Sequence, residues 1–448
     1  MKTCDRSNGV MTIMVLYLCT LFIYKDFGVR MILGYAVLGA ALILVAIRCG
    51  TMRISRCVPA LLVIAAAVFL AYGRTTARFD KDTIAYLVAM CLSVCCVLLA
   101  KTSGREYRRV ERVVFCFAAA FAVLVLISRV DRDLYMETVF PLLTEEAQEE
   151  VHFDLWHGYG CPIGGDSTFH NYMFMLATLM CLGRGAENPR RWNIYLPISL
   201  LFAVASFLTG RRGEFLVLMI VWAGIVFFAM ERRQRCGAAI LVVVLILVAV
   251  PLVPRLMESS LLSRYQYTVD TYQEGADFLG GRLDLWREAL RLFREHPLIG
   301  IGWGGYGNYV TEAFREAHGN VFNVHNIYLQ FLAETGLVGT ILILSGLFGL
   351  FFLTLKQART LRKAAPTERK GIQYAVVSLG IQSYFILTGC IDPCFMKYYF
   401  WIYYAIAFLL LQYAKEIRFA AGESKAPRKI HPAEESNDMV GESLCNRL

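Results

Sequence analysis

Long apolar runs recur along almost the whole chain, and this pattern constrains the fold more than any other feature. Most runs are long enough, or nearly long enough, to cross a bilayer core of about 30 Å as a helix. Of the 448 residues, 57% are hydrophobic and only 18% are charged, a composition that a soluble chain of this length cannot bury. The sequence predicts an all-α, polytopic membrane helical bundle of twelve spans, at residues 10–24, 30–48, 58–72, 84–100, 112–129, 168–183, 193–209, 214–230, 237–254, 335–356, 372–390 and 397–414.

The placement of lysine and arginine predicts how the bundle is oriented. With the N-terminus inside, basic residues concentrate in the inner loops, whereas the outer loop 130–167 carries Glu145, Glu146, Glu149 and Glu150. This follows the positive-inside rule and places both termini in the cytoplasm. Most of the net charge of +9 is therefore explained by the basic inner loops that orient the protein in the membrane. This charge favours contact with anionic membrane lipids, and no nucleic acid partner is needed to explain it. The inner loops are 49–57, 101–111, 184–192, 231–236 and 357–371, and the exceptions are 73–83 and 255–334.

The domain organisation is simple. Residues 1–414 form one membrane domain, and the tail 415–448 is polar and is predicted to be cytoplasmic and disordered. The outer loop 255–334, between the ninth and tenth spans, is too long to be a mere connection. Its apolar residues recur at helical spacing before Pro297, which predicts an amphipathic helix of about three turns. Those residues are Leu285, Trp286, Ala289, Leu290 and Phe293.

Fourteen cysteines are present, but no CxxC pair or HExxH motif supports a metal site, and we expect no cofactor. Most of the cysteines lie within spans, where they act as small hydrophobic residues. Cys161, Cys390 and Cys394 lie near the predicted outer face, where a disulfide is possible.

Two adjacent arginines, Arg211 and Arg212, lie between apolar spans at the predicted outer face, in the segment SFLTGRRGEFL. Arginine at membrane depth is costly and suggests a function, although an interfacial arginine that snorkels to water is the structural alternative. Arg282 follows Gly280 and Gly281, where the backbone can approach a ligand closely and a guanidinium can bind phosphate in a fork. A surface charge is the alternative for Arg282.

His325 precedes Asn326 at the entry to the tenth span. A histidine can accept a proton from a hydroxyl group near neutral pH, or it can simply anchor a helix end. His170 is a second candidate, in the other outer loop. The glycine-rich stretch IGIGWGGYG predicts either a sharp turn that brings Trp303 and Tyr306 to a substrate groove or a plain re-entrant turn.

Three motifs together resemble the O-antigen ligase and O-antigen polymerase superfamily. They are TG-x-R-G between two spans, GR-x3-W-x2-AL-x2-F-x3-PL-x-G-x-G in the long outer loop, and HN-x-YLQ-x2-AE-x-GL-x-G at the entry to the next span. They cover about 130 residues, Phe207 to Gly339, and the rest of the chain matches only in topology. The chain departs from the family pattern at Arg211, where the family often has a small residue.

The resemblance implies a metal-independent, inverting glycosyltransferase of the GT-C type in the bacterial inner membrane. Such enzymes transfer a glycan from undecaprenyl diphosphate to an acceptor sugar at the outer membrane face, and a chain-length regulator protein is a possible partner. The implied catalytic residues are Arg212, Arg282 and His325. Arginines would neutralise the diphosphate leaving group, and His325 would accept the hydroxyl proton. The expected substrate-binding residues are Arg211, Trp286, Trp303, Tyr306 and Asn326.

Three classes of function compete. The leading prediction is a repeat-unit polymerase for O-antigen, capsule or exopolysaccharide, and the alternative within the same class is a ligase that joins the glycan to lipid A-core. A polysaccharide or lipid-linked sugar transporter would require inverted repeats and ionisable residues deep within spans, and neither is evident. A structural scaffold would leave the Arg211–Arg212 pair and the His325–Asn326 pair unexplained.

Overall fold

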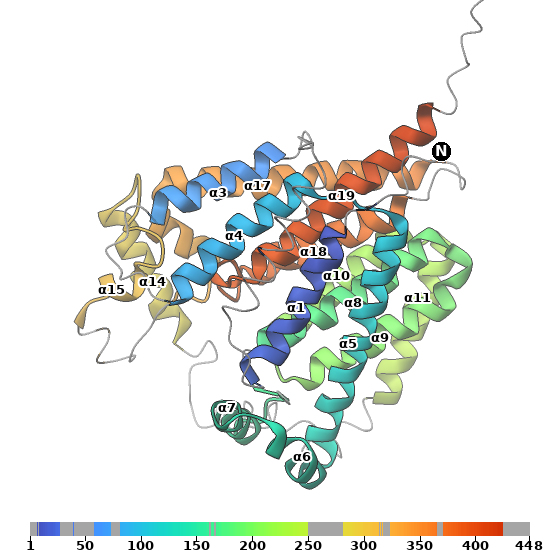
Figure 1. Cartoon of the computed structure of the whole chain (residues 1–448), viewed down its shortest axis with the longest axis horizontal. Coiled ribbons are helices and arrows are strands. Elements are labelled where there is room, and N and C mark those ends of the chain that lie inside the picture. The colour runs from blue at the N-terminus through green and yellow to red at the C-terminus, as the bar shows by residue number, and fades with distance from the viewer. Residues whose placement is uncertain are drawn as a thin grey trace, which may run out of the picture.

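The computed structural model describes residues 9–26, 58–72, 81–160, 163–164, 167–249, 281–312, 323–364 and 371–423, together with the single positions 7, 39, 314 and 316. Within these ranges the regular elements are helices and no strand occurs, which confirms the all-α prediction (Figure 1). The predicted span 30–48 apart from position 39, residues 255–280 of the long loop and the tail after residue 423 lie outside the described residues.

The long helices follow the predicted apolar runs closely. In chain order they are α1 (Val10–Asp26), α3 (Val58–Tyr72), α4 (Lys81–Leu99), α5 (Gly104–Val130), α8 (Ser167–Glu187), α9 (Trp192–Leu208), α10 (Arg212–Ala229), α11 (Arg232–Ala249), α17 (Ile327–Lys363), α18 (Ile372–Thr388) and α19 (Phe400–Glu423). Shorter elements lie between them: α6 (Arg132–Thr138), η1 (Phe140–Leu142), α7 (Glu145–Trp156), η2 (Pro189–Arg191), α14 (Arg282–Glu295), α15 (Tyr306–Tyr309) and η6 (Cys394–Met396).

Several of these helices could span a membrane by length and composition. In the described part of the chain, four are both long and apolar enough: Gly104–Val130, Pro189–Leu208, Arg212–Ala229 and Ile327–Lys363. Three shorter apolar helices lie at Val10–Cys19, Tyr86–Leu99 and Ile372–Thr388. By these criteria the chain is a helical membrane protein. The count of twelve spans and the assignment of inner and outer loops stay predictions.

The centre of the bundle is formed by α18, which packs against α8, α10, α17 and α19. Fourteen of its seventeen residues are buried, as expected for a helix that is apolar on every side. Gly380 allows α8 to approach closely, since a Cβ atom there would lie 2.4 Å from Leu179 Cδ2. Polar side chains join the helices as well: Gln382 Nε2 donates to Thr354 Oγ1 of α17 at 2.8 Å, and Ser378 Oγ donates to Ala407 O of α19 at 2.6 Å.

Three predicted loops are partly helical. α5 begins at Gly104, so most of the predicted inner loop 101–111 forms its first turns, capped by Ser103 Oγ, which accepts from Glu106 N at 3.2 Å. α17 continues to Lys363, and α19 runs on to Glu423, into the tail that we predicted to be disordered from residue 415. These ends are polar continuations of apolar helices, and hydropathy alone does not detect them.

The predicted outer loop 130–167 also holds helices that the sequence analysis missed, α6 and α7 (Figure 1). α7 begins after Thr144, whose Oγ1 accepts from Ala147 N at 3.3 Å, and acidic residues occupy its first turn. It buries Ala147, Val151 and Leu155, which recur at a spacing of four residues. The capping residue and this spacing are sequence signals, but three apolar positions among many charged ones make a weak pattern.

α17 breaks at Gly336, which has the left-handed φ of 62°. The predicted glycine-rich turn fills the break, because Ile301 N and Gly302 N donate to Ala333 O and Glu334 O at 3.0 and 2.9 Å. On the other side of the break, Leu337 N and Val338 N donate to the carbonyls of Pro297 and Leu298, at 2.8 and 3.1 Å. Residues 297–302 thus supply hydrogen-bond partners that an unbroken helix would have supplied itself.

Replacing Gly336 with alanine is predicted to destabilise the protein. A Cβ atom would lie 2.4 Å from Ile299 N and from Leu298 C, and the left-handed backbone would be strained as well. We expect a loss of at least about 1–3 kcal/mol in the free energy of unfolding, measured by denaturation in detergent. Gly349→Ala is the matched control on the same helix, because nothing lies within 4 Å of the added Cβ. Equal stability of the two variants would contradict this account.

Candidate functional site

Arg211 lies in a tight turn between α9 and α10. Gly210 has a φ of 82°, and Thr209 O accepts from Gly160 N at 3.1 Å, which fastens the turn to the end of the α7 segment. The Arg211 guanidinium carbon lies 5.2 Å from the centre of the Tyr159 ring. The side chain is half-buried, so the arginine is held at the edge of the bundle and does not extend freely into water.

A buried polar cluster supports this turn from within the bundle. Asn171 Nδ2 donates to Glu214 Oε2 at 2.8 Å, and Asn171 Oδ1 accepts from Ser206 Oγ at 2.8 Å and from Thr209 Oγ1 at 3.2 Å. All four side chains are buried. Because a buried polar network of this kind has few alternative arrangements, it restricts the position of the turn that carries Arg211.

Arg282 is the first residue of α14 and follows Gly281, whose φ is 77°. The predicted amphipathic helix is thereby confirmed, and Figure 1 shows α14 and α15 together beyond the ends of α3 and α17. The buried positions are Leu285, Glu288, Ala289 and Leu292, so Leu290 and Phe293 of the predicted set lie nearer the boundary. Ala289 and Leu292 pack with Ile301, Tyr306, Val310, Val324 and Ala333.

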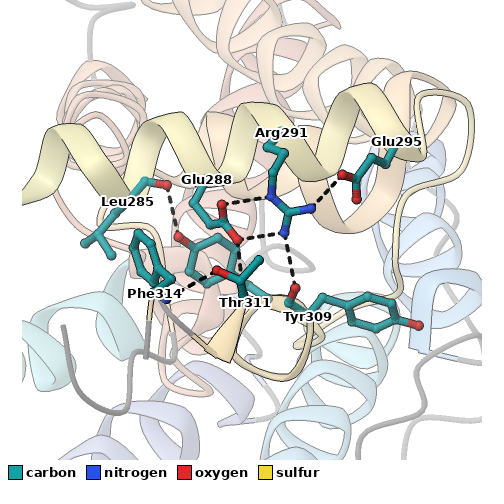
Figure 2. Close-up of polar contacts among 8 residues, drawn as sticks. Leu285, Glu288, Arg291, Glu295, Tyr309, Thr311 and Phe314 are labelled. Carbon is teal, nitrogen blue, oxygen red and sulfur yellow. Dashed lines mark hydrogen bonds and ion pairs between the residues drawn. The ribbon is translucent and has the colours of Figure 1, made fainter. Parts of the chain in front are cut away.

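An ion-pair network ties α14 to the segment after α15, as Figure 2 shows. Arg291 donates from Nε and Nη2 to Glu288 at 2.9 and 2.7 Å, from Nη1 to Glu295 at 2.6 Å and from Nη2 to Tyr309 O at 3.3 Å. Glu288 Oε1 also accepts from Thr311 N at 3.4 Å. The Arg291 guanidinium lowers the pKa of the Glu288 carboxyl. Arg291 therefore bridges α14 and the end of α15.

Glu334 connects the glycine-rich turn to α17. Its buried carboxylate accepts from Gly304 N at 2.8 Å, from Tyr306 N at 3.3 Å and from Gln330 Nε2 at 3.1 Å. Tyr306 Oη in turn donates to Leu285 O of α14 at 3.0 Å. The position of Arg282 at the start of α14 therefore depends on a chain of contacts that begins at the break in α17.

His325 occupies the turn that leads into α17 and is the only described residue other than glycine with a positive φ, 51°. Such a conformation is uncommon outside glycine, although histidine adopts it more readily than most residues. The turn is anchored to the end of α18, because Ile327 N donates to Gly389 O at 2.8 Å and Tyr328 Oη donates to Ile386 O at 2.6 Å. The strained backbone is consistent with a functional position.

Positive charges from three separate segments converge on His325. Burial has the largest effect on its imidazole, followed by the charges of Arg282, Lys397 and Arg211, and together they lower the pKa of His325 to about 4. Residues from the α9–α10 turn, the start of α14 and the α18–α19 connection thus share one electrostatic environment. His325 is neutral at pH 7 and can accept a proton.

The sequence analysis missed Lys397. It is a cation on the side of the membrane where the predicted orientation disfavours positive charge, the same signal that drew attention to Arg211 and Arg212. Of those two arginines, Arg211 is the member whose charge lowers the pKa of His325. Arg212 begins α10 with an exposed side chain. The catalytic role of Arg212 stays a prediction, and Arg211 becomes a second candidate for it.

Three of the predicted substrate-binding residues have packing or capping roles in the structure. Trp303 is buried against Tyr86 and Phe331, with ring centres 5.7 and 5.8 Å away, and Tyr306 is buried beneath α14. Asn326 caps α17: its Oδ1 accepts from Tyr328 N and Leu329 N at 3.1 and 3.2 Å, and its Nδ2 donates to Cys390 O at 3.3 Å. Substrate binding by these three side chains stays a prediction.

The remaining candidates differ in their surroundings. Trp286 is half-buried on α14, and its buried Nε1 has no hydrogen-bond partner among the described residues, so it stays a candidate. His170 is buried in α8 with its ring edge-on to Phe121, 5.2 Å between centres, and lies in the interior of the bundle.

Cys390 and Cys394 are both free thiols, and Cys161 lies outside the described residues. In the described chain, no group of three or more His, Cys, Asp or Glu side chains is arranged to hold a metal ion.

Removing the Arg291 guanidinium is predicted to loosen α14. Arg291→Ala leaves the buried Glu288 carboxylate without its main partner, which we expect to cost about 1–3 kcal/mol of local stability. Hydrogen–deuterium exchange of the α14 amides measures this as faster exchange. Arg287→Ala is the control, since Arg287 pairs with Asp284 at 2.8 Å on the exposed face and such pairs contribute at most about 1 kcal/mol. Unchanged protection of α14 in Arg291→Ala would refute the bridging role.

The charge of Arg282 is predicted to hold down the pKa of His325. Arg282→Gln removes a positive neighbour, so the pKa of His325 should rise from about 4 towards its ordinary value, without reaching it because burial remains. An NMR titration of labelled histidine, with the His325 resonance assigned by its absence in His325→Gln, measures the shift. Arg287→Gln on the same helix should leave the titration unchanged, and an equal shift in both variants would argue against a specific contact.

Comparison with known proteins agrees with the motifs and with this geometry. Residues 197–344, which include Arg211, Arg282 and His325, match the family model described as O-antigen ligase. The chain is 31% identical over 86 residues to the exopolysaccharide production protein ExoQ of Rhizobium meliloti, a match that covers 18% of this chain and 20% of that protein. It is 25% identical over 172 residues to an uncharacterized protein of Haemophilus influenzae, which covers 36% of this chain and 43% of that protein.

The matched segments span less than half the length of either relative. The family model match, over residues 197–344, nevertheless includes Arg211, Arg282 and His325. The family match and the ExoQ relative together confirm the resemblance of this chain to the O-antigen ligase and O-antigen polymerase superfamily.

Proposed function

We propose that this protein is a membrane glycosyltransferase that transfers a glycan from an undecaprenyl diphosphate carrier to a sugar hydroxyl at the outer face of the bacterial inner membrane. The observation that supports it best is the convergence of Arg211, Arg282 and Lys397 on His325. A cluster of cations beside a neutral imidazole suits a reaction in which a doubly charged diphosphate leaves while a hydroxyl loses its proton.

The proposed reaction is a single displacement. The acceptor hydroxyl oxygen attacks the anomeric carbon, the bond from that carbon to the diphosphate oxygen breaks, and the diphosphate leaves with the electron pair. The hydroxyl proton passes to His325. Attack opposite the leaving group inverts the anomeric configuration. Arg211 and Arg282 stabilise the charge on the departing diphosphate, and we predict that no metal ion is needed.

The low pKa of His325 agrees with this order of events. In the free protein, burial and three positive charges keep the imidazole neutral and make it a weak base. A bound diphosphate would offset those positive charges and raise the pKa of His325, so that the base becomes stronger when the donor is present. Donor binding and proton acceptance would thus be coupled through the same charges.

We favour a polymerase that extends a lipid-linked repeat unit, because the relative ExoQ is an exopolysaccharide production protein. The ligase is the second candidate, because the matched family model bears that description. The two reactions share the donor and the leaving group and differ only in the acceptor. A chain-length regulator would be a partner of the polymerase alone.

The test is a transfer assay with purified protein in detergent, an undecaprenyl diphosphate-linked repeat unit and EDTA. The native protein should form a ladder of longer lipid-linked glycans. We expect His325→Ala to lose about 10²–10⁴-fold in rate and Arg211→Ala or Arg282→Ala about 10²–10³-fold. Arg212→Ala and Arg287→Ala should lose much less, since neither side chain is placed to contact the diphosphate in this account.

Each outcome separates the alternatives. A single transferred product on an added lipid A-core acceptor, with no ladder, would identify the ligase. Loss of activity in EDTA that added metal restores would contradict the metal-independent reaction. If well-folded protein transferred no glycan with any matched donor and acceptor, the glycosyltransferase proposal would be wrong. Transport would then be the leading function, and a flux assay would test it.

A further inference from the structure

A pocket of about 640 Å³ lies on α7, in the segment between α5 and α8, and involves none of the residues that surround His325. All but one of its lining residues come from a single face of α7, and Phe140 of η1 forms the remaining wall. The lining residues are Phe140, Glu145, Gln148, Glu149, His152, Phe153 and Trp156.

Contacts on both sides of α7 hold the lining of the pocket in place. Its opposite side is buried through Ala147, Val151 and Leu155. Gln148 Nε2 donates to Phe140 O and Leu143 O, both at 3.1 Å, and so fixes η1 against α7. The pocket is therefore formed before any ligand arrives, which reduces the entropy cost of binding.

The aromatic part of the lining is unusually exposed. Trp156 is 74% and Phe153 is 59% accessible to solvent, and the His157 ring lies beside both, 4.7 and 4.0 Å from their ring centres. Exposed apolar groups gathered at one place usually mark a binding surface. A flat indole with a polar rim suits a sugar ring, whose C–H face stacks on the aromatic plane while its hydroxyls remain free to hydrogen-bond.

The polar part of the lining complements a sugar as well. Glu145 and Glu149 are exposed, and neither forms an ion pair with any residue in the described part of the chain. Carboxylates accept hydrogen bonds from hydroxyl groups and, more strongly, from ammonium groups. The same carboxylates repel a uronic acid or an anionic lipid headgroup.

A helix lying in the membrane surface is the competing explanation for exposed Trp156 and Phe153. Such helices separate an apolar face from a polar face that is rich in lysine and arginine. α7 has no basic residue other than a histidine, and its exposed aromatic and acidic side chains share one face. The observations therefore favour a soluble, polar ligand with flat apolar faces.

The pocket also lies close to the turn that carries Arg211. Only two residues separate Trp156 from Tyr159, so their Cα atoms are at most about 11 Å apart. The Tyr159 ring lies against the Arg211 guanidinium, and Gly160 N donates to Thr209 O of the same turn. A chain molecule held on α7 would extend towards Arg211 over a short distance.

We propose that the α7 pocket is a glycan-binding subsite for a neutral or amino-sugar segment of the substrate chain, one that bears no carboxylate. The proposal rests on the proposed function for the identity of the chain, but binding at α7 requires no transfer. It predicts a substrate class: glycans whose repeat unit contains uncharged hexoses or hexosamines bind, and polyuronates do not.

Binding is measured on the full-length protein in detergent, without lipid diphosphate, by calorimetry with three free oligosaccharides: a glucosamine oligomer, a neutral hexose oligomer and a galacturonate oligomer. We expect affinity to fall in that order. Trp156→Ala should weaken the first two by at least about tenfold, and Glu149→Gln should weaken mainly the glucosamine oligomer. Leu142→Ala is the matched control, since Leu142 is 68% exposed on η1 yet does not line the pocket.

The same titrations in His325→Ala separate this inference from the proposed function. Oligosaccharide binding that survives in His325→Ala and is lost in Trp156→Ala supports the subsite whether or not the protein transfers glycans. Equal binding by Trp156→Ala and the native protein overturns it, as does tightest binding of the galacturonate oligomer. Quenching of Trp156 by brominated lipid in nanodiscs would also overturn it, because the ring would then lie in the membrane.

Discussion

The break in α17 at Gly336 is the constraint on which the candidate site depends. A helix that stops hydrogen-bonding to itself inside the bundle must find other partners, since unpaired backbone groups in an apolar environment are costly. Residues 297–302 provide them, and Glu334 extends the same arrangement to Gly304 and Tyr306. α14 then rests on Tyr306 and on the Glu288–Arg291 pair. One helix break therefore helps to determine where Arg282 lies relative to His325, which occupies the turn at the start of α17.

The electrostatics of the site follow from the same geometry. Arg211, Arg282 and Lys397 come from segments that are far apart in sequence, and bringing them together costs free energy unless an anion arrives. The bundle supplies rigid supports for each: the buried Asn171 cluster beneath the Arg211 turn, the α14 network, and the α18–α19 connection. Like charges that are held together in the absence of ligand favour the binding of a multiply charged anion. The neutral imidazole of His325 can accept a proton.

The segments around α14 and α7 contribute different surfaces. The segment around α14 is basic and meets His325, whereas the segment around α7 is acidic and aromatic. Tyr159 and Gly160 join them at the Arg211 turn. Such a division suits a substrate with a charged diphosphate at one end and a neutral glycan along the rest, because each part meets complementary chemistry. The contacts of Tyr159 and Gly160 with the Arg211 turn connect the two surfaces.

The sequence by itself determined the helical class, the approximate limits of most long helices and the amphipathic helix that ends before Pro297. These follow from hydropathy, periodicity and local motifs, which are properties of neighbouring residues. It did not determine that the charges of Arg211 and Lys397 lower the pKa of His325, that Trp303, Tyr306 and Asn326 serve packing and capping, or that α7 lines a pocket. Those depend on contacts between segments tens to hundreds of residues apart, and only the tertiary structure decides them, because no local pattern records which distant side chains share a face.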